Sequence, residues 1–142
     1  MANVFDVSDF ILRQCGRITA MKLQKLAYYC QAWSLVWDER ALFPERIEAW
    51  ANGPVIPALF DAHRGEFQVT DEPRGDYTNL TEQERETITS VLRKYGDKTA
   101  PWLSELTHNE APWLDARDGV PDHVRSNVEI TTASMAEYYG NL

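Results

Sequence analysis

The strongest pattern in the chain is a helical repeat of apolar residues between residues 20 and 37. At about 100° per residue, one third of the helix circumference collects Leu23, Leu26, Ala27, Cys30, Trp33, Ser34 and Trp37. A second apolar strip, roughly opposite, consists of Met21, Tyr28, Ala32 and Leu35. Few polar positions separate the two strips, so neighbouring elements must cover this helix on two sides. The pattern predicts a central buried helix over about residues 20–37.

A shorter repeat predicts a first helix over residues 7–15. Asp6 is a suitable N-cap for it, and Gly16 can take the left-handed conformation that ends it. Phe5 and Phe10 then have the spacing of a hydrophobic staple. The first helix is therefore expected to begin at Val7.

The remaining patterns predict short helices and a small β element. A capping box at Thr81 and Glu84 opens a helix that ends at Gly96. Other helices are predicted over about residues 57–63, 99–108, 112–117 and 133–139, with strands over 47–50 and 128–130 and a weak one over 67–69. Residues 65–79 have the composition of a surface excursion. The fold class is mainly α, a single compact helical domain around the central helix.

Tryptophans and one turn complete the structural prediction. Asn52-Gly53-Pro54 is a turn, because Gly tolerates positive φ and Pro fixes the φ that follows. Trp33 and Trp37 lie on the main face of the central helix and are predicted to be core. The other three, Trp50, Trp102 and Trp113, lie at or near turns, where half-exposed rings are candidates for partner contacts. Trp102 is otherwise expected to point inward from its helix.

Charge narrows the classes of function. The 142 residues carry 14 Lys+Arg and 22 Asp+Glu, a net charge of -8, which argues against a nucleic-acid binder. Residues 71–142 contribute -7 of this, either as a solvated surface or as a match to a basic partner. The chain shows neither a signal peptide nor a run of about 18 apolar residues, so a cytoplasmic protein without membrane insertion is expected. Cys15 and Cys30 are expected to be reduced thiols.

Candidate chemistry is sparse. Three histidines, His63, His108 and His123, are too widely spread for a metal-binding spacing, and no phosphate-binding or nucleophile motif occurs, so neither metal nor cofactor is expected. His108 and Glu110, between Trp102 and Trp113, form the densest polar cluster. They are either a general acid–base pair or, together with Arg117, a hydrogen-bonded structural corner. No nucleophile accompanies them, which favours structure or binding.

Three stretches together resemble the Panacea domain, the antitoxin domain of many bacterial and phage toxin–antitoxin pairs. They are LQKLAYYCQAW at residues 23–33, IEAWANGPVIP at 47–57 and LSELTHNEAPW at 103–113. The resemblance extends from about residue 5 to 139 and implies that residues 1–142 form a single Panacea domain. It also implies a non-enzymatic antitoxin that binds and neutralises a toxin encoded beside it.

The resemblance and the residue patterns together suggest one candidate site, a structured corner near the toxin contact. Its members are Trp50, Asn52, Gly53, Pro54, His108, Glu110, Trp113 and Arg117. Two alternatives to direct neutralisation stay open: an adaptor that delivers a partner to a protease, and a small hydrolase-like enzyme that uses His108 and Glu110. The sequence leaves open the identity of the toxin, the stoichiometry and the formation of homo-oligomers.

Overall fold

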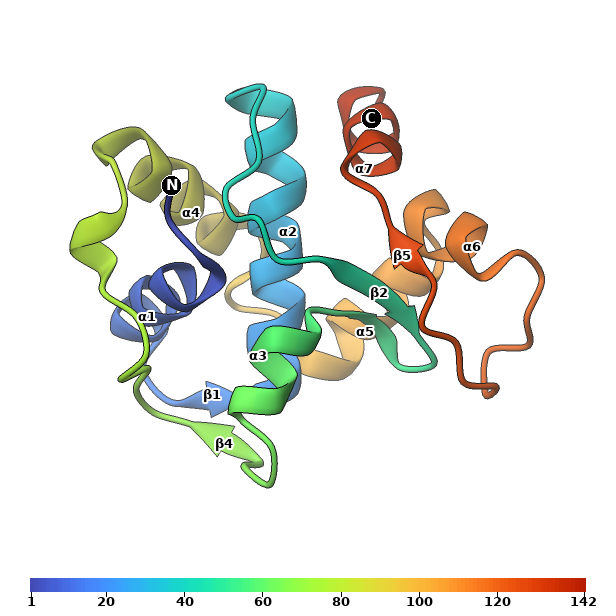
Figure 1. Ribbon diagram of the computed structural model, residues 1–142, viewed down its shortest axis with the longest axis horizontal. Coiled ribbons are helices and arrows are strands. Elements are labelled where there is room, and N and C mark those ends of the chain that lie inside the picture. The colour runs from blue at the N-terminus through green and yellow to red at the C-terminus, as the bar shows by residue number, and fades with distance from the viewer.

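The computed structural model describes residues 1–142, and its longest helix, α2 (Ala20–Trp37), runs through the middle of the molecule (Figure 1). The Thr19 hydroxyl accepts a hydrogen bond of 3.1 Å from the backbone N–H of Lys22 and caps the helix. Every residue from Leu23 to Ser34 is buried. The predicted central buried helix is therefore confirmed, with the predicted bounds.

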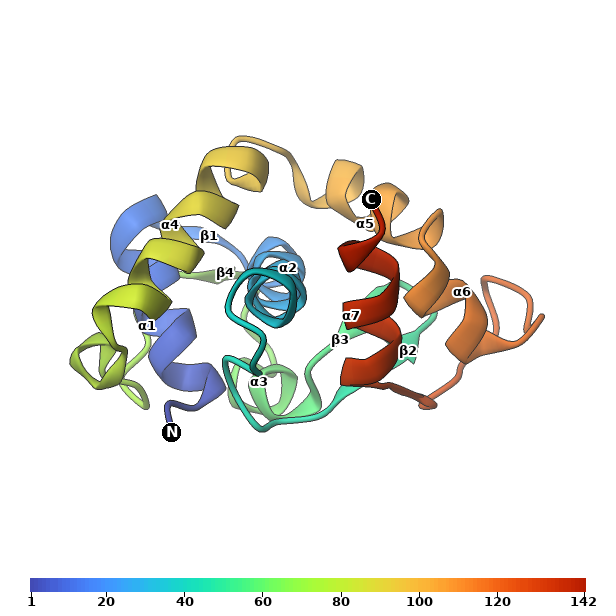
Figure 2. The same ribbon diagram turned by 90° about the horizontal axis from the view of Figure 1, so that it is seen from above.

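Six further α-helices surround α2. They are α1 (Val4–Cys15), α3 (Pro57–Ala62), α4 (Glu82–Tyr95), α5 (Ala100–His108), α6 (Ala111–Arg117) and α7 (Thr132–Gly140), with one short 3-10 helix, η1 (Tyr77–Asn79). Seen end-on in Figure 2, α2 has α1 and α4 on one side and α5, α6 and α7 on the other. Thirty buried hydrophobic residues, from the helices and from the strands and loops between them, form one core cluster. The prediction of a mainly α, single compact domain is confirmed.

Helix α1 begins three residues before the predicted start. Asn3, not Asp6, is the N-cap, because its side chain accepts from the backbone N–H groups of Phe5 and Asp6. Asp6 occupies the third helical position and completes a capping box by accepting from the backbone of Asn3. Phe5 therefore lies inside the helix, and the predicted staple with Phe10 is wrong. Gly16 ends the helix at a φ of 73°, as expected.

Two small antiparallel sheets complete the fold. Strand β2 (Ile47–Trp50) lies between β3 (Gly53–Val55) and β5 (Glu129–Ile130), which confirms the predicted β element. Strands β1 (Ile18–Thr19) and β4 (Gln68–Val69) form the second sheet. Trp50 pairs with Gly53, so the turn between β2 and β3 is Ala51–Asn52, one residue before the predicted turn, and Pro54 lies on an edge strand that tolerates it.

Two predictions for tryptophans are wrong, that Trp37 belongs to the core and that Trp102 points inward, whereas the alternative of a half-exposed Trp102 is confirmed. Trp37 is 47% exposed, because it is the last residue of α2, where it stacks on Trp33 with ring centroids 5.1 Å apart and leaves its remaining surface open. Trp102 is also 47% exposed, since α5 turns Leu103 inward and Lys98 covers the Trp102 ring from outside at 5.0 Å. Both rings are therefore surface features.

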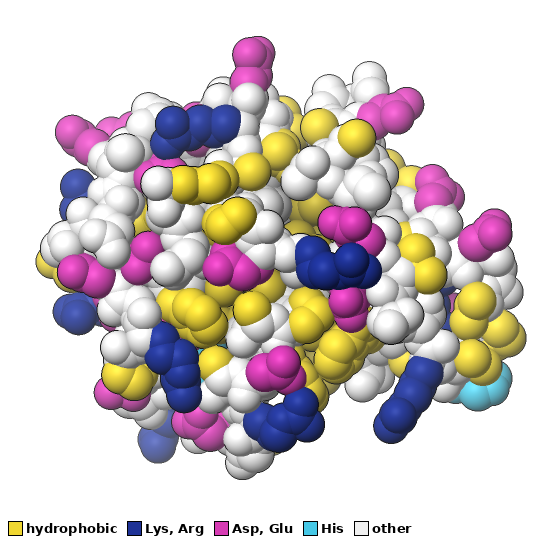
Figure 3. Space-filling view, in the orientation of Figure 1, with side chains coloured by type: hydrophobic (Ala, Val, Ile, Leu, Met, Phe, Trp, Pro, Cys, Tyr) yellow, Lys and Arg dark blue, Asp and Glu magenta, His cyan; other side chains and the backbone are white.

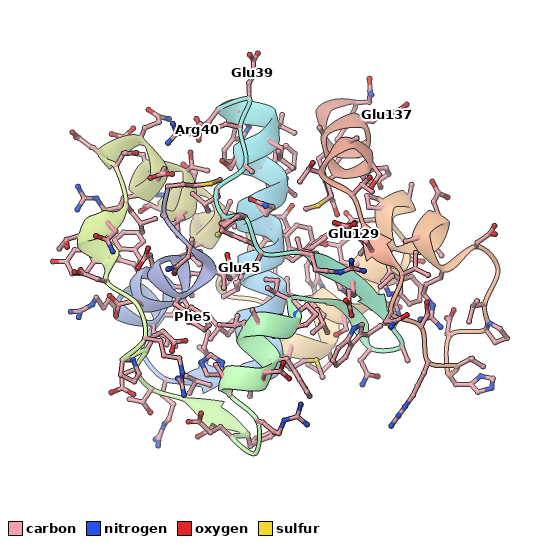
Figure 4. The ribbon with its side chains drawn as sticks, viewed as in Figure 1. Phe5, Glu39, Arg40, Glu45, Glu129 and Glu137 are labelled. Carbon is pink, nitrogen blue, oxygen red and sulfur yellow. The ribbon has the colours of Figure 1, made fainter.

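Side chains from distant segments fasten the periphery to the core. Glu45, labelled in Figure 4, lies in the loop after α2 and accepts a hydrogen bond of 3.0 Å from the backbone N–H of Val4. Arg40 and Glu84 form an ion pair of 3.0 Å between that loop and α4. None of the helices combines the length with the apolar character that crossing a bilayer requires.

Candidate functional site

The hairpin of β2 and β3 is held from behind through its main chain. The indole N–H of Trp113 donates to the carbonyl of Trp50 at 2.8 Å, and the Arg117 guanidinium donates to the carbonyl of Ala49 at 3.0 Å. Arg117 also donates to the carbonyls of Pro121 and Val124 in the loop after α6. Trp113 and Arg117 are 1% and 2% exposed. A buried cation that has no carboxylate partner here joins strand β2 to the loop after α6 by binding three carbonyls.

We refer to Trp113 and Arg117 together as the hairpin clamp, and the ring of His108 stacks beside it. The imidazole of His108 lies against the Trp113 indole, with centroids 4.1 Å apart and planes at 15°. The Arg117 guanidinium lies 4.9 Å from the centroid of the same indole. Burial lowers the pKa of His108, and the positive charges of Lys25 and Arg117 lower it further, against the raising effect of Asp122. His108 is therefore held in its neutral form at neutral pH.

Glu110, at the N-terminus of α6, turns into the core. Its Oε1 accepts hydrogen bonds from the phenols of Tyr29 at 2.6 Å and Tyr139 at 2.8 Å, and the Tyr139 hydroxyl lies 3.0 Å from that of Tyr28. Burial raises the pKa of Glu110, although the two phenols act in the opposite direction. The carboxylate thus joins α2, α6 and α7. It makes no hydrogen bond with His108, so the two residues do not have the geometry of an acid–base pair.

Lys25 of α2 lies directly under the hairpin. It is fully buried, and its Nζ donates to the carbonyl of Pro54 at 3.3 Å and to the sulfur of Met21 at 3.6 Å, with no carboxylate partner. Gly53 has a φ of 113°, and a Cβ there would lie 2.8 Å from the Cε of Lys25. Gly53 is therefore required both by its backbone conformation and by the close approach of Lys25.

The Lys25→Met variant is expected to raise the free energy of unfolding by about 2 kcal/mol near neutral pH, since it removes a buried charge but keeps a side chain of similar length. Burial lowers the pKa of Lys25 to about 8 from 10.5. Between about pH 8 and pH 10.5, the folded and unfolded pKa values, the unfolded wild type binds more protons than the folded protein. The free energy of unfolding of the wild type therefore rises with pH over this range. Urea unfolding from pH 7 to 10.5 should show the advantage of the variant shrinking; a constant difference would contradict a buried charged amine.

Two adjoining hollows open on the outer side of the hairpin. The first, of about 270 Å³, is the more enclosed; the second, of about 660 Å³, is wider. Both are lined by Trp50, Asn52, Phe60 and Arg64. The first is also lined by Thr19, Ala20, Met21, Gln24, Val55, His63, Gly65, Glu66 and Phe67, and the second by Ala51, Arg125, Ser126 and Asn127. We refer to the two hollows together as the aromatic groove.

Large apolar side chains remain exposed along this groove. Phe67 is 79% exposed, Met21 39% and Phe60 37%. Trp50 is half-buried and meets Phe60 edge-on, with ring centroids 4.9 Å apart. In the space-filling view, hydrophobic side chains also show across the middle of the face that Figure 3 presents, between acidic and basic ones. Exposed aromatic side chains around a hollow are typical of an interaction surface.

A buried polar network supports one wall of the groove. His63, at the end of α3, places its Nε2 2.6 Å from Oε1 of Glu72, which also accepts from the hydroxyl of Ser8 at 2.9 Å. The second oxygen of Glu72 accepts from Arg74 at 3.1 Å. Glu72 and Ser8 are buried, so the network fixes His63 from within. No group of three or more His, Cys, Asp or Glu side chains is placed to hold a metal ion.

The structure divides the predicted corner into three parts. Trp50 and Asn52 line the groove, whereas His108 lies at a separate open hollow beside Asp122. Gly53 and Pro54 are buried within the hairpin itself, whereas Glu110, Trp113 and Arg117 are buried in α6 and at its N-terminus. Trp113 therefore presents no half-exposed ring to a partner.

Most of the groove escaped the sequence reasoning. Its unpredicted members include Met21, Phe60, His63, Arg64 and Phe67, which come from α2, α3 and the segment before β4. One available signal was Phe67, a single phenylalanine in a glycine-rich, charged excursion where nothing nearby in sequence would cover it.

Comparison with known proteins identifies the family. The family model described as "Antitoxin SocA-like, Panacea domain" matches residues 23–114. The matched range contains the central helix from Leu23 onward, the β2–β3 hairpin, the exposed aromatic residues of the groove and the Glu110–Trp113 segment. Searches of characterised proteins and of solved structures gave no match. Because the matched range covers well over half of its length, the chain belongs to the SocA-like antitoxin family with the Panacea domain.

Proposed function

We propose that this protein is an antitoxin that neutralises a toxin encoded beside it, by direct protein–protein binding in the cytoplasm and without catalysis. Family membership supports the role of antitoxin. The observation that carries the mode of action is the aromatic groove, in which Met21, Trp50, Phe60 and Phe67 present apolar surface around one hollow. Aromatic residues and Met are enriched at protein interfaces, and their burial against a partner supplies binding energy.

The polar residues of the corner give no comparable support to a hydrolase. The Glu110 carboxylate is occupied by two phenols, and His108 is stacked on Trp113 without a hydrogen bond to Glu110. The hairpin clamp instead uses buried side chains to hold the strand that carries Trp50. This arrangement suits a rigid recognition surface.

Co-expression with the adjacent gene tests the proposal. The product of that gene alone should arrest growth, the antitoxin should restore it, and the two proteins should co-purify in a defined ratio. Rescue should persist in protease-deficient cells, since direct binding needs no degradation. Loss of rescue in those cells would favour an adaptor that delivers the toxin to a protease, and rescue without co-purification would contradict neutralisation by binding.

A further inference from the structure

The enclosed part of the aromatic groove has the size of one large side chain. Its volume is about 270 Å³, at the lower limit of the roughly 300–1,000 Å³ typical of small-molecule sites. Trp50, Phe60 and Phe67 contribute aromatic walls. Interface hot spots are commonly aromatic anchors that fill such recesses. The walls therefore fit an aromatic anchor from the partner protein.

One polar atom in the recess selects among aromatic anchors. The carboxylate of Glu72 accepts hydrogen bonds, so the Nε2 of His63 carries the proton that joins them. The Nδ1 of His63 makes no hydrogen bond within the chain, and His63 lines the recess. In the tautomer whose single ring proton is on Nε2, the second nitrogen is an acceptor. Tyr and Trp carry a donor on an aromatic ring, whereas Phe does not.

The rim of the groove has the opposite charge to the chain as a whole. Its charged residues are Arg64, Arg125 and Glu66, in a protein of net charge -8. Arg64 is exposed and pairs with Asp61 at 2.8 Å, while Arg125 is exposed and has no ion pair within the chain. The wider hollow is lined by both arginines and by no acidic residue. A partner segment that lies there gains from acidic side chains.

We propose that the aromatic groove receives a Tyr or Trp side chain from an acidic segment of the toxin, with the ring between Trp50, Phe60 and Phe67, its donor toward His63, and acidic neighbours beside Arg64 and Arg125. The inference rests on the proposed function and adds the chemistry of the segment that is bound. The proposed contact involves the basic residues Arg64 and Arg125. It is therefore a different contact from the one that the acidic residues of the second half could make with a basic partner.

Groove variants test the location. Phe67→Ala and the double variant Arg64→Glu/Arg125→Glu change exposed side chains, so the fold should persist, which circular dichroism and thermal unfolding verify. Each should weaken binding of the adjacent gene's product by about tenfold or more in calorimetry. The matched controls are Trp37→Ala, an exposed aromatic at the other end of α2, and Arg93→Glu on α4, and both should bind like the wild type.

The outcomes separate the two proposals. Wild-type binding that is lost in the groove variants and kept in the controls supports the inference. Equal binding by wild type and groove variants overturns it and leaves neutralisation by binding intact. If the wild type itself does not bind the product of the adjacent gene, the proposed function fails, and the inference fails with it.

Photocrosslinking tests the chemistry of the occupant. With p-benzoylphenylalanine in place of Phe67, irradiation of the complex should link the groove to one toxin segment, which mass spectrometry identifies. The segment should contain Tyr or Trp with Asp or Glu beside it. A linked segment that is basic or lacks both aromatic types would overturn the assignment. The same label in place of Trp37 should give no link to that segment.

Discussion

Replacing Arg117 by alanine is expected to lower the free energy of unfolding by about 4 kcal/mol, because three backbone carbonyls lose charge-assisted hydrogen bonds at once. The indole of Trp113 also loses the cation beside it. The side chain is buried, so a cavity adds to the cost. The measurement is equilibrium urea unfolding monitored by circular dichroism.

Two variants control for charge and for the loss of any arginine. Arg117→Lys keeps the charge but not the planar guanidinium group, so its free energy of unfolding should lie between those of the wild type and Arg117→Ala. Arg17→Ala, at an exposed position, should change the free energy of unfolding by less than about 0.5 kcal/mol. A change that small for Arg117→Ala would mean that the hairpin does not depend on the clamp.

Replacing Glu110 by alanine is expected to cost about 3 kcal/mol, because the buried phenols of Tyr29 and Tyr139 lose their shared acceptor. Glu110→Gln keeps an oxygen at that place and should cost less than about 1 kcal/mol. Thermal and urea unfolding of the two variants would separate loss of the acceptor from loss of the charge. Similar large losses in both would mean that the two phenols depend on the carboxylate and not only on an acceptor oxygen.

The wild type and the Glu110→Gln variant also allow a test of the pH dependence of stability. The folded-state pKa of Glu110 lies above its unfolded value, so the folded chain takes up the proton more readily. The stability that this provides is fully present below the unfolded pKa and is lost as the pH rises through the folded pKa. The free energy of unfolding of the wild type should therefore rise relative to that of Glu110→Gln as the pH falls from 7 toward 4.5. A difference that changes in the opposite direction would contradict the raised pKa.

Local signals in the sequence were enough for most of the fold. Helix α2 followed from two apolar strips, and the start of α4 followed from the capping box of Thr81 and Glu84. The start of α1 did not, because Asn3 and Asp6 are both good N-caps. The choice depends on tertiary contacts: Asp6 also accepts from the backbone N–H of Asp76, which lies far along the chain.

Only part of the candidate site could be predicted from the sequence, because the rest also depends on tertiary contacts. Trp50 and Trp113, which are joined by a hydrogen bond, both lie within the quoted motifs, so both were predicted from the sequence. The groove is assembled from the start of α2, the β2–β3 hairpin, α3, the segment before β4 and the loop before β5, and no periodicity relates these segments. The network of His63, Glu72 and Ser8 likewise joins α1 to residues far along the chain.

The hairpin clamp acts on carbonyl oxygens, which every type of residue possesses. Trp113 and Arg117 hold the main chain at Trp50 and Ala49, and none of these bonds uses the side chain of Trp50 or Asn52. The outward positions can therefore change identity while the scaffold keeps its shape. In evolution or in engineering, this division lets one framework follow a changing partner by exchanging only its outermost side chains.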